Sequence, residues 1–289
     1  MNIGVVGGGS VGLLISSYLS LYHRVRVYVR RNEQAHLLRN EGIVEEKSRE
    51  NFSVESLLVE NMKEEELIII CVKQHQIEDI MPMINQTNSQ TPLLFLPNGM
   101  SHTNYLSHLT QPVYVGINSH GSLREKDNLF SHTGKGEIAY AQFNASEEGD
   151  YWLRNHLNNI SFPVRFCSSW KILLKEKLIV NAVINPLTAL FNVKNGVILS
   201  NKYLYDIAEK LCFEAAESLN LDFEENWHRV QTIAKKTSEN ISSMLKDLME
   251  NRPTENEAIS GYIITESTTE LPYTTFVYKA IQALEYKNS

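Results

Sequence analysis

One lysine and two asparagines are spaced four residues apart within the stretch from 175 to 190, KEKLIVNAVINPLTAL. If this stretch is helical, Lys177, Asn181 and Asn185 stack on one face. The other positions are nearly all apolar, which is typical of a buried helix. Desolvated lysine and asparagine side chains cost free energy unless they have partners, so the stripe requires a buried network between helices, a polar cavity or a ligand. An ammonium group beside two amides could protonate and orient a carbonyl compound, which makes the stripe a candidate active-site wall.

A second chemically suggestive pattern lies at the N-terminus. Gly7, Gly9 and Gly12 fit the spacing G-x-G-x-x-G between an apolar strand over 2–6 and a helix-like segment. The first glycine of this motif permits a tight turn, the second lets a pyrophosphate approach the backbone, and the third packs helix on strand. The helix N-terminus adds unpaired N–H groups that attract phosphate. We therefore expect a dinucleotide to bind at Gly7, Gly8, Gly9, Ser10, Val11 and Gly12.

The end of the next strand predicts which dinucleotide binds. The strand over 25–29 closes a βαβ unit and is followed by Arg30 and Arg31, with no acidic residue before Glu33. An NAD enzyme usually carries Asp or Glu there, whereas an arginine can grip the 2′-phosphate of NADP. We predict NADPH as the cofactor, with Arg30 as the main ligand of the phosphate and Arg31 beside it. An exposed basic turn without this role is the alternative.

Two further buried strands end in polar residues. The apolar run over 67–72 leads into Lys73, and the strand over 92–96 is followed by Asn98. Ligands of doubly wound sheets bind beyond the carboxyl ends of the strands, so both side chains could meet the cofactor or the substrate. The alternatives are a solvated lysine and an Asn-Gly turn with no further role.

Composition limits the classes of protein to consider. The chain has 289 residues, 43% of them hydrophobic, and a net charge of −7, which argues against a broad nucleic-acid surface. Its three cysteines lie far apart and show no metal-binding spacing. No apolar run is long enough for a membrane span, and the N-terminus opens directly on a strand. We expect a cytoplasmic protein without metal, nucleic acid or membrane as partners.

The pattern of elements predicts the architecture. Strands and helices alternate in the N-terminal half, which favours an α/β fold with a Rossmann dinucleotide-binding domain over 1–167. Within it, residues 134–140 are expected to form one arm of a hairpin. From Trp170 onward every long segment has helical period. We expect an all-α substrate and catalytic domain over 168–289.

Taken together, these motifs resemble the ketopantoate reductase (2-dehydropantoate 2-reductase) family. The resemblance rests on GGGSVG at 7–12, CVK at 71–73, PNGM at 97–100, KLIVNAVINPLTAL at 177–190, SSML at 242–245 and TENEAISG at 254–261. It spans essentially the whole chain in the same order. It implies a Rossmann domain followed by a helical domain like the C-terminal domain of 6-phosphogluconate dehydrogenase, with the active site in the cleft between them.

The resemblance also implies roles for single residues. Lys177 corresponds to the catalytic lysine that protonates the carbonyl oxygen, and Glu255 to its acidic partner. Asn98 would position nicotinamide and substrate, and Lys73 falls on the cofactor-side lysine. The substrate's carboxylate and hydroxyl groups would bond to Asn181, Asn185 and Ser243. Pro97 stands where many members carry glutamine, and Asn118-Ser119 replaces a threonine-rich stretch, which leaves the substrate preference less secure.

Two of these roles have structural alternatives. Thr254 and Glu257 match a helix capping box, in which case Glu255 is only an acid in the first turn. Ser242 and Ser243 could simply cap a helix.

The chemistry is coherent without the family. Hydride transfer to a 2-oxo group places negative charge on its oxygen, which a protonated lysine stabilises and can neutralise. Apolar neighbours would lower the lysine pKa from its usual value of about 10.4 and ease proton donation. A carboxylate such as Glu255 would oppose an excessive drop.

Three functions remain in view. The first is NADPH-dependent reduction of ketopantoate to pantoate in pantothenate and coenzyme A biosynthesis, with Lys177 as general acid. The second is reduction of another branched 2-oxo acid by the same residues, and the third is a catalytically idle NADP-binding regulatory protein. The second domain could pair with another copy as a homodimer, and no heptad or apolar stripe decides this.

Overall fold

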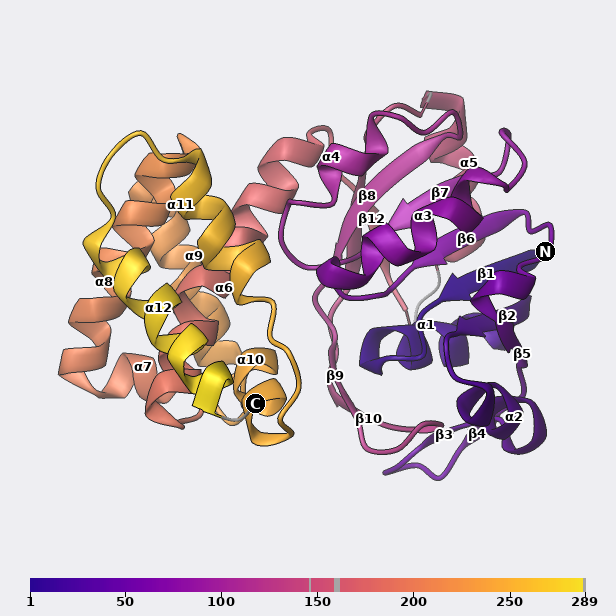
Figure 1. The fold of residues 1–289 in the computed structure, drawn as a ribbon, viewed down its shortest axis with the longest axis horizontal. Coiled ribbons are helices and arrows are strands. Elements are labelled where there is room, and N and C mark those ends of the chain that lie inside the picture. The colour runs from indigo at the N-terminus through magenta and orange to yellow at the C-terminus, as the bar shows by residue number, and fades with distance from the viewer. Residues whose placement is uncertain (146, 159–161, 288–289) are drawn as a thin grey trace. The chain divides into compact units, whose positions relative to one another are not determined.

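The computed structural model describes residues 1–145, 147–158 and 162–287. Its contacts divide the chain into two compact units. The first contains Met1–Pro97 and His102–Leu173, and the second contains Asn98–Ser101 together with the chain from Leu174 onward. Figure 1 shows the strands of the first unit in indigo to magenta and the helices of the second in orange to yellow. The fold is thus the expected Rossmann domain followed by an all-α domain.

The first unit is built around an eight-stranded sheet with the strand order β12-β11-β8-β7-β6-β1-β2-β5. All neighbouring strands in it are parallel except β11, which runs antiparallel to β8. Its strands are β1 (Asn2–Val6), β2 (Arg24–Val29), β5 (Glu55–Leu58), β6 (Leu67–Ile70), β7 (Leu93–Phe95), β8 (Val113–Asn118), β11 (Ile138–Gln142) and β12 (Val164–Phe166).

The order of the strands places the candidate residues at one edge. β1 pairs with β2 on one side and with β6 on the other, so the direction of the strand order reverses at β1. Val6 is in register with Ile70, and Ile70 with Phe95, so three neighbouring strands end together. Gly7 and Lys73 follow two of these ends, as the sequence predicts for a ligand site at a switch point.

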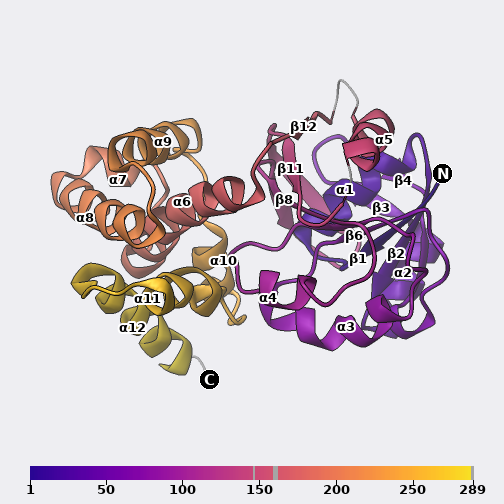
Figure 2. The same ribbon diagram turned by 90° about the horizontal axis from the view of Figure 1, so that it is seen from above.

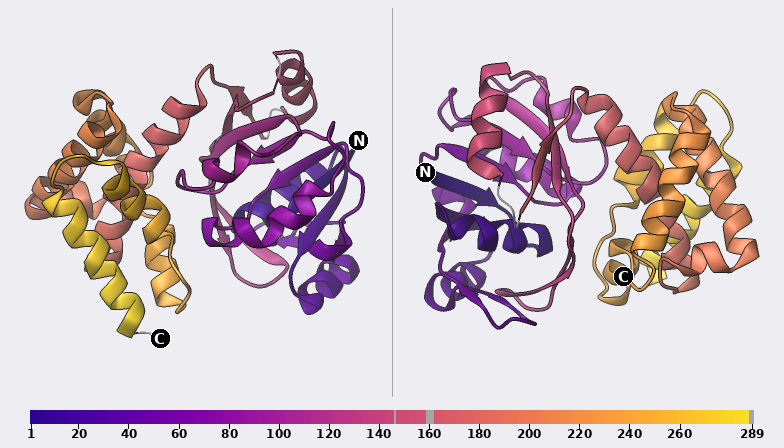
Figure 3. Two further views of the ribbon diagram at one scale, coloured as in Figure 1. Left: turned by 45° about the horizontal axis from the view of Figure 1, so that its top comes forward. Right: turned by 180° about the vertical axis from the view of Figure 1, so that it is seen from behind.

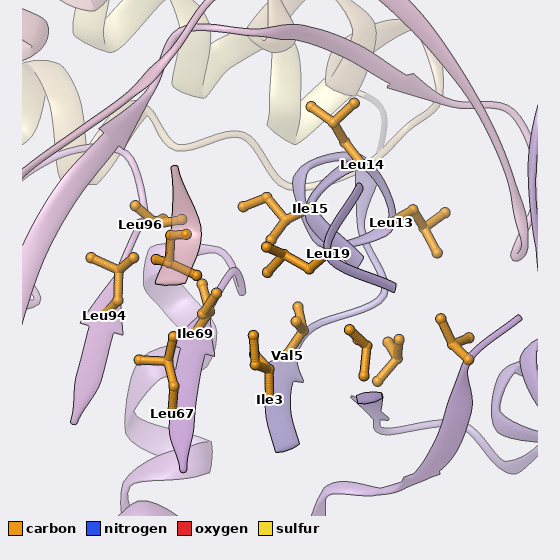
Figure 4. Packing of buried hydrophobic residues seen from close by; sticks show 14 of the residues in the cluster. Ile3, Val5, Leu13, Leu14, Ile15, Leu19, Leu67, Ile69, Leu94 and Leu96 are labelled. Carbon is orange, nitrogen blue, oxygen red and sulfur yellow. The ribbon is translucent and has the colours of Figure 1, made fainter. Parts of the chain in front are cut away.

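Burial explains why the central strands are so apolar. β6 is buried at every position, as expected for a parallel strand covered on both faces. α1 (Ser10–Ser20) covers one face and packs Leu13, Ile15 and Leu19 into the same core as Ile3 and Val5 (Figure 4). The other helical segments of this unit are α2 (Asn32–Glu41), η1 (Val59–Asn61), η2 (Gln74–Gln76), α3 (Ile77–Asn85), α4 (Thr103–Leu106) and α5 (Glu147–Leu157).

A second, four-stranded sheet with the order β4-β3-β10-β9 also contacts α1. Its strands are β3 (Ile43–Glu45), β4 (Asn51–Phe52), β9 (Gly121–Arg124) and β10 (Leu129–Gly134). The hairpin therefore lies over 121–134, between β9 and β10. The expected hairpin arm over 134–140 is wrong, because the chain changes sheets after Gly134 and β11 pairs with β8 and β12 instead.

All regular secondary structure in the described residues of the second unit is helical (Figure 3). Its long central helix, α6, begins at Trp170 in the first unit and ends at Phe191. The following elements are α7 (Val197–Ser200), α8 (Lys202–Leu219), α9 (Phe223–Lys236), α10 (Ser243–Met249), the π-helical turn η3 (Glu257–Gly261), α11 (Tyr262–Glu266) and α12 (Pro272–Lys287). α8 packs against α7, α9, α11 and α12.

Capping contacts tie these helices together. Glu214 of α8 is buried and accepts hydrogen bonds from the backbone N–H groups of Tyr273 and Thr274, at 3.0 and 2.7 Å. It also accepts one from the Thr274 hydroxyl at 2.7 Å. A carboxylate at a helix N-terminus satisfies donors that the helix leaves unpaired and complements its dipole. The contact fixes where α12 begins on α8.

The assignment of residues 98–101 to the helical unit was not expected from the sequence, which predicts a single domain boundary between residues 167 and 168. That division stays a prediction. No helix within the described residues is both long enough and apolar enough to cross a membrane.

Candidate active site

The predicted polar stripe lies on α6, which Figure 2 draws amid the other helices of its unit. The helix forms because the segment is rich in leucine, isoleucine and alanine, and these side chains are buried from Leu178 through Ala189. Asn181 and Asn185 are each only 7% exposed, and Lys177 is partly buried. The spacing of four residues therefore places three polar side chains on a largely buried helix.

These three side chains lack partners in the part of the chain that the structure describes. Among the described residues, Lys177, Asn181 and Asn185 form no side-chain hydrogen bond or ion pair. Burial lowers the pKa of the Lys177 ammonium, and no nearby charge offsets this effect. The sequence left open a buried network between helices, but none of these three side chains is hydrogen-bonded to another described residue. A ligand that accepts and donates hydrogen bonds would satisfy it.

A neighbouring network does involve the same helix, one turn further on. The Thr188 hydroxyl lies 2.8 Å from the carbonyl oxygen of Ile184 and 2.7 Å from Ser242 Oγ. Ser242 Oγ in turn accepts the Leu245 N–H at 3.1 Å and caps α10. Ser242 is therefore the capping residue, whereas Ser243 is the exposed first residue of the helix. The substrate-binding role of Ser243 stays a prediction.

Glu255 and Asn98 meet within the helical unit, although 157 residues separate them in the sequence. Asn98 Nδ2 donates a hydrogen bond to Glu255 Oε2 at 2.8 Å. Gly99 has φ of +79°, and a Cβ there would collide with the carbonyl oxygen of Ala258 in η3. Only glycine allows this approach of two backbones. The contact brings two of the three predicted catalytic residues together.

The predicted capping box at Thr254 is wrong. The Thr254 N–H donates to Glu285 of α12 at 2.8 Å, and Glu257 accepts a hydrogen bond from Tyr278 of the same helix. That bond to Glu257 raises the pKa of Tyr278 to about 12. Thr254 Oγ1 instead accepts the N–H of Asn256, at 3.1 Å. Glu255 is thus presented by a turn that α12 braces, and this turn leads into the π-helical segment, a feature common at functional sites.

The glycine loop in the first unit has the geometry that the motif predicts. Gly7 has φ of +115°, and a Cβ at Gly12 would collide with the carbonyl oxygen of Gly7. A Cβ at Gly9 would meet no atom within 4 Å, so the loop is open at this residue. Ser10 and Val11 begin α1, which has neither a side-chain cap nor an acidic residue in its first turn. The loop therefore offers unpaired N–H groups and one open side to a phosphate.

The predicted cations are placed as follows. Arg30 is exposed, and its Nη1 lies 3.8 Å from Asp79 Oδ2. Arg31 forms an ion pair with Asp127. Lys73 is partly buried after β6, and its backbone N–H donates to Gln76 Oε1 at 3.3 Å. No carboxylate follows β2 directly, at the position where NAD enzymes usually carry an acidic residue.

Sequence reasoning missed three residues beside the glycine loop. Gln34 Nε2 donates to the carbonyl oxygens of Gly8 and Asp127, at 2.8 and 2.9 Å. Arg124 Nη1 lies 3.5 Å from the carbonyl oxygen of Gly8 and 3.5 Å from Asp127 Oδ1. No local pattern marks Arg124 and Asp127, because the hairpin that carries them reaches the loop through long-range contacts of β9 and β10 with α1 and of β10 with β3.

Comparison with known protein families decides the relationship. The family model described as ketopantoate reductase PanE/ApbA matches residues 3–145, and the model of its C-terminal part matches residues 172–285. The chain belongs to the ketopantoate reductase family. A curated relative, the 2-dehydropantoate 2-reductase of Bacillus subtilis (strain 168), is 40% identical over 292 residues, covering 99% of this chain and 98% of the relative. Members of this family so named are oxidoreductases.

Solved structures agree with this assignment to the ketopantoate reductase family. The crystal structure of the probable 2-dehydropantoate 2-reductase panE from Bacillus subtilis has a TM-score of 0.87 at 39% identity, covering 98% of this chain and 100% of that one. A D-mandelate dehydrogenase with NADH and anilino(oxo)acetate has a TM-score of 0.93 at 19% identity, covering 100% and 99%. This second likeness concerns the fold alone.

Proposed function

We propose that this protein reduces 2-dehydropantoate to pantoate with NADPH, as a step of pantothenate and coenzyme A biosynthesis in the cytoplasm. The observation that carries the proposal is the stripe of Lys177, Asn181 and Asn185 on a buried helix, to which the described residues supply no side-chain hydrogen bond. The names of the relatives supply the substrate, and the glycine loop with Arg30 and Arg31 supports the cofactor.

Lys177 acts as the general acid. NADPH supplies the hydride. As negative charge grows on the carbonyl oxygen of the substrate, the Lys177 ammonium stabilises it and transfers a proton from Nζ. The lowered pKa of Lys177 makes this transfer easier.

The remaining polar residues orient the substrate. Asn181 and Asn185 have unused amide groups for a carboxylate or a hydroxyl group, and Ser243 adds an exposed hydroxyl. Glu255 can accept a hydrogen bond from the substrate hydroxyl, and Asn98 holds one of its oxygens. Bound in this way, the reacting carbon is fixed relative to the proton donor.

A second candidate is the reduction of another 2-oxo acid by the same residues. It is favoured by one observation, the similar fold of a D-mandelate dehydrogenase, whose structure was determined with NADH. Because the fold accommodates more than one substrate, the pocket and not the architecture must set the preference.

The deciding experiment follows the loss of NADPH absorbance with purified protein. Ketopantoate is compared with pyruvate, 2-oxoisovalerate and 2-oxopantolactone, and each assay is repeated with NADH. Fast turnover of ketopantoate with a strong preference for NADPH is the expected result. Better turnover of another acid would move the protein to the second candidate, and no turnover of any acid would favour an NADP-binding regulatory protein.

A further inference from the structure

A carboxylate lies between two guanidinium groups beside the glycine loop. Arg31 Nη2 donates to Asp127 Oδ1, and Arg124 Nη1 lies 3.5 Å from the same oxygen. The Arg31 side chain is 52% exposed, that of Arg124 30% and that of Asp127 28%. The carboxylate is therefore the least exposed of the three, and solvent can reach both cations.

This cluster adjoins the end of β2, where a Rossmann fold binds the adenosine ribose. Arg31 is the second residue after β2, and Arg124 ends β9 with Nη1 3.5 Å from the carbonyl oxygen of Gly8. Gln34 joins the two segments by donating to Gly8 and to the Asp127 carbonyl. The hairpin turn thus supplies the predicted phosphate site with a third arginine and with an anion.

We propose that Asp127 occupies the place which the 2′-phosphate of NADPH takes between Arg31 and Arg124. Arg124 is then a phosphate ligand, and Asp127 competes with the phosphate for both guanidinium groups. The inference rests on the proposed use of NADPH. Carboxylate and phosphate oxygens both match the paired donors of a guanidinium, so one oxyanion can replace the other.

Contacts other than those of the Asp127 side chain hold the turn in place. The main-chain oxygen of Asp127 is bound by Gln34, at 2.9 Å. Asn128 Nδ2 donates to the carbonyl oxygen of Gly42 at 3.1 Å, and the Asn128 carbonyl accepts the Val44 N–H at 2.8 Å. Ion pairs with this much exposure also contribute little to stability. Asp127 can therefore be changed without loss of the hairpin.

Arg30 lies farther from its partner carboxylate, Asp79, than Arg31 lies from Asp127. Its Nη1 lies 3.8 Å from Asp79 Oδ2, and both side chains are more than half exposed. Its guanidinium can turn to a ligand without giving up a close contact. Of the two arginines after β2, Arg31 is thus the one whose availability to phosphate depends on Asp127.

The test compares two small probes that differ only by one phosphate, 2′,5′-ADP and 5′-AMP, whose binding is measured by calorimetry at low salt. Asp127→Asn is expected to bind 2′,5′-ADP about fivefold more tightly, since a repelling charge and a competitor are removed, and 5′-AMP as before. Arg124→Met is expected to weaken 2′,5′-ADP binding about tenfold and to leave 5′-AMP binding unchanged. Glu137→Gln is the control, because it removes the same charge from an exposed ion pair with Arg165 at the β12 end of the sheet.

The outcomes separate this inference from the proposed cofactor. Unchanged or weaker binding of 2′,5′-ADP by Asp127→Asn would overturn the role of Asp127, while the wild-type preference for 2′,5′-ADP would keep NADPH in place. If Glu137→Gln also bound 2′,5′-ADP more tightly, the effect would come from the net charge of the protein alone, and the proposed role of Asp127 would be overturned. If the wild-type protein binds the two probes equally, the proposed use of NADPH fails first, and the role of Asp127 fails with it.

Discussion

The two regions proposed to bind ligands differ in whether their cationic side chains form ion pairs. Beside the glycine loop, Arg30, Arg31 and Arg124 each have a carboxylate within ion-pair distance. On α6, Lys177 has no ion pair within the described part of the chain, and burial lowers its pKa. An arginine that is already paired with a carboxylate can bind a phosphate, but the phosphate must displace that carboxylate. An unpaired, partly buried lysine is destabilised in its charged form until charge develops next to it, which suits a proton donor.

The largest expected effect comes from removing the unpaired cation. Lys177→Ala should lower kcat about a thousandfold, because the proton donor and its charge are lost together. Binding of NADPH, measured by fluorescence titration, should stay nearly unchanged. Lys171→Ala, which removes an exposed lysine of the same helix, is the control and should keep full turnover. Full turnover in Lys177→Ala would remove the residue from the mechanism.

The next effect separates two glycines of the loop. A Cβ at Gly12 would collide with Gly7, so Gly12→Ala should lower the free energy of unfolding by about 3 kcal/mol. Gly9→Ala should leave the melting temperature unchanged, because its Cβ meets open space, yet weaken NADPH binding about tenfold by blocking the phosphate. Thermal unfolding and cofactor titration measure the two effects. Native cofactor affinity in Gly9→Ala would mean that phosphate approaches from another side.

The pH dependence of turnover tests the lowered pKa of Lys177. A general acid works only when protonated, so kcat should fall as the pH rises through this pKa. Because burial lowers the pKa, the fall should occur below pH 10.5, the ordinary value for a lysine. In Lys177→Arg the residual activity should lack this limb, since arginine stays charged. If the wild-type protein and Lys177→Arg both lost turnover over the same pH range, the loss would be due to the titration of another group.

The smallest effect concerns stability. Lys177→Met should raise the free energy of unfolding by about 1 kcal/mol at pH 7, since it removes a charge that burial disfavours. Arg31→Met should change it by less than about 0.5 kcal/mol, because its ion pair is exposed. The lowered pKa means that the unfolded chain binds more protons than the native protein between the two pKa values of Lys177. Native stability therefore rises with pH through that interval, and the advantage of methionine shrinks. Urea unfolding at several pH values measures this.

The sequence predicts those parts of the site that depend on local spacing. The glycine loop and the stripe on α6 follow from residues within one turn or one helix, and both are present as expected. The capping box at Thr254 failed because its donors and acceptors bind Glu285 and Tyr278, which lie 31 and 21 residues further on. Arg124 was missed for a similar reason, since long-range packing of β9 and β10 on α1 brings its hairpin beside the loop. Long-range partners override local propensity, and one sequence does not reveal them.

The grouping of Asn98–Ser101 with the helices limits how this protein could be recombined with its relatives. Four residues from the middle of the Rossmann half are packed with η3, and Gly99 fits there only because it lacks a side chain. A chimera joined once, near residue 170, would combine this segment from one parent with residues 255–261 from the other. Such exchanges should succeed only when both short segments come from the same parent. The two segments form one structural unit even though more than 150 residues separate Asn98 from Glu255 in the sequence.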